Sequence, residues 1–170
     1  RGNRLYFAGR REQNPSKPMP SDANSTMRMS YGTIKGYSPA DAVEYDYFTT
    51  SRGILEKNNP ESTEFNVFPS FLELIKKGDW GRWADKKDGK LHVAFISTND
   101  ITGGNSGSPV FDKNGRVFGL AFDGNWEAMS GDIEFEPNLQ RTIVVDIRYV
   151  LFTIDKWGKC SRLIDEMTIK

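Results

Sequence analysis

The segment Thr102–Val110, with the sequence Thr-Gly-Gly-Asn-Ser-Gly-Ser-Pro-Val, constrains the fold of this chain more than any other. It places three glycines around Ser106 and runs directly into an apolar strand. Glycine adopts positive φ angles readily and lets backbone amides face one point with no Cβ in the way. In a Gly-x-Ser-Gly turn, the amides of Gly104 and Ser106 can hold an oxyanion. The segment predicts a serine nucleophile on a tight turn; the alternative is a Gly/Ser-rich hairpin loop without chemistry.

The residues after Ser106 predict a β-hairpin. Asn114-Gly115 lies between the apolar runs 110–111 and 117–122, and Asn-Gly in that position is a strong hairpin signal. A period of two in apolar residues predicts half-buried strands elsewhere. The expected strands cover residues 26–37, 43–50, 91–97 and 142–146.

The helical segments are expected at the ends of the chain and in its middle. A capping box formed by Ser70 and Glu73 predicts a helix over 71–77, which Gly78 ends. The C-terminal helical segments are expected over 147–157 and 161–167, whereas 124–137 is expected to be a loop. Together the elements predict a mainly β fold, a six-stranded barrel with short helices and a C-terminal helical segment.

The composition excludes several classes of protein. Lys and Arg number 23, as do Asp and Glu, so no bulk charge attracts nucleic acid or an anionic membrane. No apolar run approaches the roughly 18 residues that span a bilayer. A single cysteine rules out a disulfide within the chain. We therefore expect neither a nucleic acid nor a membrane as a partner.

The chain has one histidine, His92, which must be considered as the base for Ser106. A serine nucleophile needs an adjacent general base. His92 lies on the strand that leads to the serine turn, only fourteen positions upstream, whereas the base of such a triad usually comes from another part of the fold. We interpret His92 as a strand residue without a catalytic role, which leaves the nucleophile without a base in this chain.

Three segments carry a specific resemblance to a known family. They are residues 98–110 around the serine, 119–127 and 146–152. They resemble the C-terminal portion of the bacterial dipeptidyl-peptidase 7 and 11 family, and the shorter matches at 22–28 and 36–39 extend the similarity over nearly the whole chain from Asp22 onward. The resemblance implies a chymotrypsin-like double barrel with a helical domain inserted between its halves. It also implies an enzyme that removes dipeptides from free N-termini.

The family resemblance implies roles for individual residues. Ser106 stands at the nucleophile, Gly104 supplies an oxyanion amide, and Asp123 matches the carboxylate that holds the substrate's α-ammonium. Gly124 stands where members that prefer acidic side chains carry arginine, so apolar P1 residues are implied, as in the dipeptidyl-peptidase 7 branch. The aromatic residues Phe122 and Trp126 are further candidates for the substrate cleft; simple packing at the rim is the alternative.

The resemblance also predicts the organisation around this chain. Residues 1–21 are expected to be the end of the inserted helical domain and a linker, and residues 22–170 the C-terminal half of the peptidase domain. The catalytic His and Asp would come from an N-terminal barrel outside this chain, so the chain alone is expected to be inactive. The implied enzyme is a periplasmic homodimer that needs no metal or organic cofactor. The rival interpretations are a fragment of a chymotrypsin-like endopeptidase and a non-catalytic binding domain that retains the serine turn.

Overall fold

The computed structural model describes residues 2–17, 27–131, 133 and 135–170. Its strands are β1 (Tyr37–Ala40), β2 (Val43–Tyr45), β3 (Phe48–Thr50), β4 (His92–Ser97), β5 (Pro109–Phe111), β6 (Val117–Gly124) and β7 (Thr142–Asp146). Its α-helices are α1 (Gly2–Gln13), α2 (Ser51–Lys57), α3 (Pro69–Lys77), α4 (Ile147–Phe152) and α5 (Ser161–Asp165). Shorter helical turns are η1 (Gly81–Trp83), η2 (Trp126–Ser130) and η3 (Thr153–Trp157).

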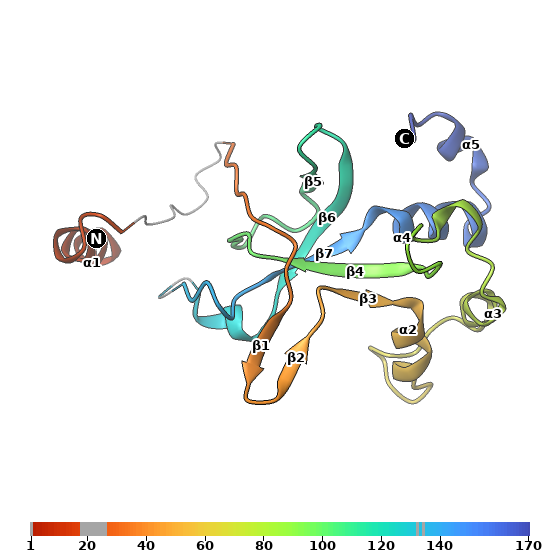
Figure 1. Cartoon of the computed structure of the whole chain (residues 1–170), viewed down its shortest axis with the longest axis horizontal. Coiled ribbons are helices and arrows are strands. Elements are labelled where there is room, and N and C mark those ends of the chain that lie inside the picture. Colours follow the sequence, from red (N-terminus) through yellow and green to blue (C-terminus); the bar gives the residue numbers. More distant parts are fainter. Residues whose placement is uncertain (1, 18–26, 132, 134) are drawn as a thin grey trace.

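A five-stranded antiparallel sheet forms the centre of the molecule, in the order β3-β4-β7-β6-β5 (Figure 1). The hairpin β1-β2 forms a separate two-stranded sheet. The mainly β architecture is confirmed. Within the described residues the strands form an open sheet, not a closed six-stranded barrel, because the edge strands β3 and β5 do not pair with each other.

The hairpin after the serine is confirmed. β5 and β6 pair antiparallel, with Val110 opposite Gly119. The turn between them places Gly115 at φ 74°, a left-handed conformation that glycine adopts without strain. The Asp112 carboxylate accepts hydrogen bonds from the amides of Asn114 and Arg116 and so closes the turn. The hairpin thereby fixes the serine turn at the end of two paired strands.

Two of the predicted strands differ in the structure. Residues 27–36 contain only an isolated bridge at Ile34, and the strand begins later, at Tyr37. Met27 is 100% exposed and Tyr31 86% exposed, so the alternation of residues there reflects no buried face of a sheet. The predicted strand over 43–50 is divided into β2 and β3, which belong to different sheets. Residues 18–26, which include part of the predicted linker and the 22–26 portion of a resembling segment, lie outside the described residues.

The helix over 71–77 is confirmed, but its predicted capping box is wrong. Pro69 begins α3, because its fixed φ suits the first helical turn. Ser70 therefore lies inside the helix, where its hydroxyl accepts a hydrogen bond from Trp157 instead of capping the N-terminus. Gly78 ends the helix in the left-handed conformation, with φ 67°, as predicted. No helix in the described part of the chain is long and apolar enough to cross a membrane.

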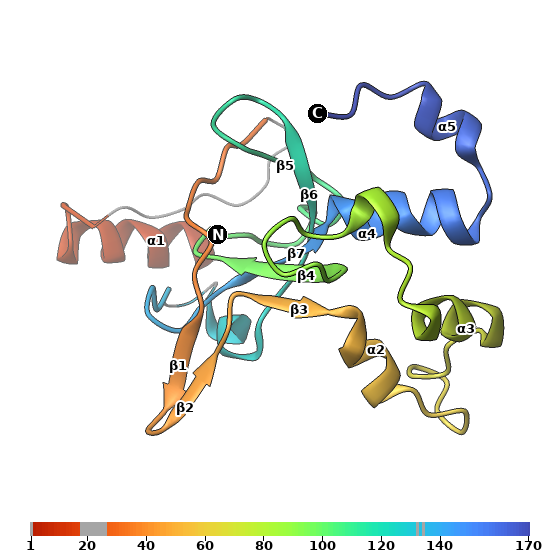
Figure 2. The ribbon, with the colours of Figure 1, turned by 45° about the vertical axis from the view of Figure 1, so that its right-hand side comes forward.

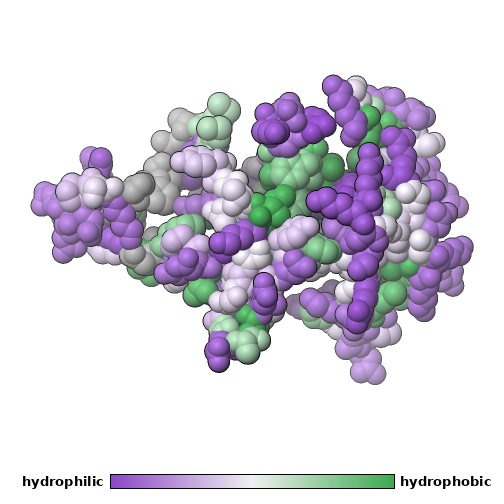
Figure 3. All heavy atoms as spheres, in the orientation of Figure 1, coloured by the Kyte–Doolittle hydropathy of each residue, from purple (hydrophilic) through white to green (hydrophobic). Residues whose placement is uncertain are grey.

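The main hydrophobic core lies among the helical segments α3, η1, α4 and α5, beside the start of β4. It contains Phe71, Ile75, Trp83, Leu91, Leu151, Phe152 and Ile164. α4 follows β7 directly, and Asp146 caps it by accepting from the Arg148 amide. α1 lies to one side of the sheet in both ribbon views (Figures 1 and 2). The surface in Figure 3 alternates small apolar areas, one of them over the β5–β6 hairpin, with larger hydrophilic ones.

Candidate active site

The serine turn has the backbone that its sequence predicts. Gly104 has φ 98° and Gly107 has φ 83°, so glycines on both sides of Ser106 adopt conformations that other residues rarely reach. Asn105 stabilises the turn from within, because its side-chain oxygen accepts from the Thr102 amide at 3.0 Å. The Asn105 contact was not among the sequence predictions. Asn side chains can bond backbone groups three residues earlier in the chain, and that spacing is the signal that could have revealed it.

Some backbone amides of the serine turn donate hydrogen bonds within the chain, and others do not. The Asn105 N–H donates to Thr102 O, and the Gly107 N–H donates to Ala121 O at 2.7 Å. Neither the Gly104 nor the Ser106 N–H donates to another group in the part of the chain that the structure describes. These two amides are therefore available to a bound oxygen atom, as an oxyanion hole requires.

The Ser106 side chain is exposed to solvent and lies beside β6. Its hydroxyl donates to the Phe122 carbonyl at 3.1 Å. Ser106, Phe122, Asp123 and Gly124 together border a cleft of about 280 Å³. The serine turn supplies one side of this cleft, and the end of β6 supplies another. Hence the hydroxyl, the carboxylate and the glycine that sequence reasoning singled out lie at one cleft, although their roles stay predictions.

A β-bulge at the end of β6 determines how Asp123 is presented. Ala121 pairs with Val144 and Asp123 pairs with Ile143. The register therefore advances by two residues on β6 but by only one residue on β7. In a regular strand Asp123 would face the same side as the buried Ala121, because side chains alternate with a period of two. The bulge breaks this alternation, and Phe122 and Asp123 are both exposed. The Asp123 carboxylate accepts from the Gly124 amide at 2.8 Å, which fixes it at the cleft.

The two aromatic candidates differ in position. Phe122 borders the cleft and is 59% exposed, as a residue that contacts a substrate would be. Trp126 is 81% exposed and does not border the cleft. The structure therefore gives the prediction for Trp126 no geometric support.

Arg141 contributes to the cleft wall but its charge is not directed at a ligand. Its side chain is buried, with the residue 3% exposed. The guanidinium donates to the backbone carbonyls of Lys35, Gly36, Pro137, Asn138 and Gln140. It is the only Lys or Arg among the described residues that border the cleft, and these carbonyls use its three nitrogens. The cleft thus presents no uncommitted cation beside Gly124.

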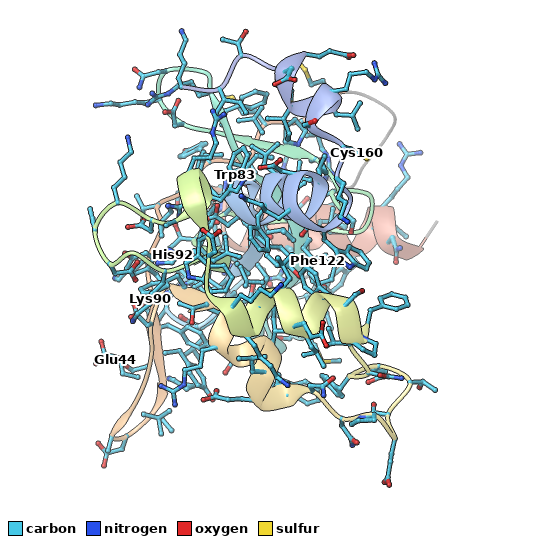
Figure 4. All side chains as sticks on the ribbon, turned by 90° about the vertical axis from the view of Figure 1, so that its right-hand side faces the viewer. Glu44, Trp83, Lys90, His92, Phe122 and Cys160 are labelled. Atoms are coloured by element: carbon cyan, nitrogen blue, oxygen red, sulfur yellow. The ribbon has the colours of Figure 1, made fainter. Side chains whose placement is uncertain are left out.

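His92 lies too far away to act on Ser106. β7 lies between β4 and β6, and its residue Val144 pairs with Phe95 on β4 and with Ala121 on β6. His92 is three residues from Phe95, about 10 Å along the strand, and β4 is two strand spacings of roughly 4.8 Å from β6. The His92 ring stacks on Phe48 with centroids 4.1 Å apart. In Figure 4 the labelled His92 and Phe122 side chains accordingly lie apart.

His92 and two nearby carboxylates form a group of three potential metal ligands. The ligand atoms of Asp85, Asp88 and His92 lie within 4.8 Å of one another. Asp85, however, forms an ion pair with Arg148 at 2.6 Å, and this hydrogen bond, together with one from the Lys87 amide, lowers the pKa of Asp85 from 3.8 to about 2. His92 Nε2 lies 3.0 Å from Asp88. Because a fixed cation already neutralises Asp85, the group is better described as an ion-pair network than as a metal site.

Comparison with known proteins identifies the family of this chain. The family described as Peptidase S46 matches residues 1–169. The chain belongs to the peptidase S46 family. Its S46 relatives include dipeptidyl-peptidase 7 of Porphyromonas gingivalis, which is 66% identical over 169 residues, a match covering 99% of this chain and 24% of the relative. The Asp/Glu-specific dipeptidyl-peptidase of the same organism is 49% identical over 169 residues, a match covering 99% of this chain and 23% of the relative.

Solved structures of S46 relatives share the fold of this chain. The crystal structure of Porphyromonas endodontalis DPP11 in complex with the dipeptide Arg-Glu matches with a TM-score of 0.85 and 46% identity. The match covers 95% of this chain and 23% of that one. The chain therefore spans about a quarter of the length of the relatives that it matches. The resemblance noted in the sequence is confirmed, and the roles of individual residues stay predictions.

Proposed function

We propose that this chain forms the nucleophile-bearing part of a serine dipeptidyl-peptidase that releases dipeptides from free N-termini. One observation carries the proposal: Ser106, with unused amides beside it, shares a cleft with the exposed carboxylate of Asp123. The names of the S46 relatives, which are dipeptidyl-peptidases, support the reaction class.

The proposed reaction passes through an acyl-enzyme. A histidine outside this chain takes the proton of the Ser106 hydroxyl, and the oxygen attacks the carbonyl carbon of the substrate's second residue. The Gly104 and Ser106 amides stabilise the resulting oxyanion. The histidine then protonates the leaving amine, and water hydrolyses the ester to free the dipeptide and restore the serine. The distance of His92 from β6 supports an external base, which the N-terminal barrel of the complete protein would supply together with an Asp.

Asp123 is proposed to fix the length of the released product. A charge-assisted hydrogen bond to the substrate's α-ammonium, worth about 1.5–3 kcal/mol, holds the N-terminus at a set distance from Ser106. The test uses the complete protein that carries this chain, with dipeptidyl reporters whose N-termini are free or acetylated. Free N-termini should react at least tenfold faster, and Asp123→Asn should remove the difference. Equal rates for both reporters would favour an endopeptidase.

Gly124 supports a preference for uncharged, apolar P1 side chains. The cleft beside it presents no uncommitted cation, because the Arg141 guanidinium serves backbone carbonyls. An acidic P1 side chain would be desolvated there without a partner, which is costly. P1 Leu or Met should therefore exceed P1 Asp or Glu in kcat/KM. Gly124→Arg should reverse this order if the side chain reaches the P1 position, and an unchanged order would contradict the assignment of Gly124.

A non-catalytic binding domain is the second rival. A fluorophosphonate should label Ser106 in the complete protein and leave Ser106→Ala unlabelled. Absence of labelling in a protein that is folded and dimeric would favour this rival. We also propose, from the family resemblance, that the complete protein is a periplasmic homodimer; cell fractionation and sedimentation test this directly.

A further inference from the structure

The cleft wall beside Gly124 is closed by a second small residue. Gly124 does not adopt a positive φ, so its backbone conformation is open to any residue. A Cβ added there would nevertheless lie only 3.0 Å from the Cβ of Ala128, well inside the roughly 3.5–4.0 Å at which carbon atoms attract. The limited room for a Cβ at position 124, and not the φ angle there, is therefore what favours glycine. Ala128 defines that space.

Ala128 is held in place by a hydrogen-bond network that includes residues of the cleft wall. It belongs to η2, and its amide donates to Asn125 O at 3.0 Å. Asn125 is buried: its amide donates to Arg141 O, and its side-chain oxygen accepts from the Arg141 amide at 2.8 Å. The Glu127 carboxylate accepts from Asn125 Nδ2 and from the Tyr37 hydroxyl, both at 2.8 Å. η2 therefore cannot shift away from Gly124 without breaking several of these hydrogen bonds.

We propose that Ala128 is a second specificity-determining residue, which together with Gly124 limits the size of the P1 side chain. This inference rests on the proposed function and names the substrate class more closely: small and medium apolar P1 residues fit against the Ala128 methyl group. The apolar residues Met129 and Phe135 border the same cleft. A larger residue at position 128 shortens the pocket, and glycine deepens it.

The test measures kcat/KM of the complete protein for dipeptidyl reporters with one P2 residue and P1 Ala, Leu, Met or Phe. Ala128→Val should lower the Phe:Ala ratio of kcat/KM about tenfold or more, since each methylene in an apolar pocket changes selectivity roughly 10–200-fold. Ala128→Gly should raise the same ratio. Ser130→Val is the matched control, because Ser130 is exposed on the same helical turn and does not border the cleft. It should leave the ratio within twofold.

A pair of variants tests the contact itself. Gly124→Ala should lower kcat/KM for P1 Leu and Phe, and adding Ala128→Gly should restore most of the loss, because the second change removes the methyl group that the new Cβ meets. If Ala128→Val does not fold, Ala128→Gly still tests the proposal, since it adds no atoms.

The outcomes separate this inference from the proposed function. A wild-type protein that cleaves no dipeptidyl reporter overturns the proposed function and this inference with it. A wild-type protein that cleaves them, with Phe:Ala ratios of both Ala128 variants within twofold of the wild type, overturns the role of Ala128 alone. Ratios that move in opposite directions for Val and Gly, while fluorophosphonate labelling of Ser106 persists, support it.

Discussion

Replacing Gly104 by alanine tests whether the serine turn holds its amides ready for an oxyanion. Gly104 has φ 98°, and a Cβ there would meet no atom within 4 Å. Steric contact therefore contributes nothing, and the cost of alanine lies in the backbone, about 1–3 kcal/mol for a residue in a sparsely populated region. The exposed turn can relieve that strain by rotating the peptide, which removes the Gly104 N–H from the oxyanion. Loss of one such donor lowers kcat by about 100–1,000-fold.

Gly103 is the matched control for this change. It is the neighbouring residue, has no positive φ, and a Cβ there would also meet no atom within 4 Å. Gly103→Ala should therefore leave kcat within about twofold to threefold. Stopped-flow or steady-state kinetics with a dipeptidyl reporter, on complete proteins of similar melting temperature, provide the comparison. A Gly104→Ala kcat within twofold of wild type, or an equal loss for Gly103→Ala, would refute the argument.

Two predictions concern stability. Gly119→Ala should destabilise the protein by about 1–3 kcal/mol through overpacking, since its Cβ would lie 2.4 Å from Val144 Cγ1. Gly53→Ala, in α2 with open space around it, should instead stabilise the protein by up to about 1 kcal/mol. Urea denaturation measures both changes, and stability changes of the same sign would contradict the packing argument. The hydrogen bond from Arg148, together with that from the Lys87 amide, lowers the pKa of Asp85 from 3.8 to about 2, so the stabilisation is fully present above pH 4 and is lost as the pH falls towards 2. After allowance for screening it is worth about 1–2 kcal/mol. Asp85→Asn should remove it at pH 7 and make little difference near pH 2, whereas a stability difference independent of pH would exclude the ion pair as its cause.

Local sequence signals predicted those features that depend on neighbouring residues. The Asn114-Gly115 turn, the end of α3 at Gly78 and the positive φ angles around Ser106 all follow from the conformational freedom of glycine. The strands β4 and β7 could be predicted because both are apolar runs bounded by turn residues. The capping box failed because Pro69, one residue earlier, begins the helix.

The sequence by itself thus determined that a glycine-lined turn presents Ser106 in front of a β-hairpin. It could not determine which way Asp123 faces, because strict alternation from the buried Ala121 would turn that carboxylate inward, and only the bulge against β7 brings it out. Nor could it place Ala128 against Gly124, since that contact depends on Asn125 and its bonds to Arg141, a residue sixteen positions away. Such features arise from pairing between distant segments, whose register is set by packing of the whole sheet.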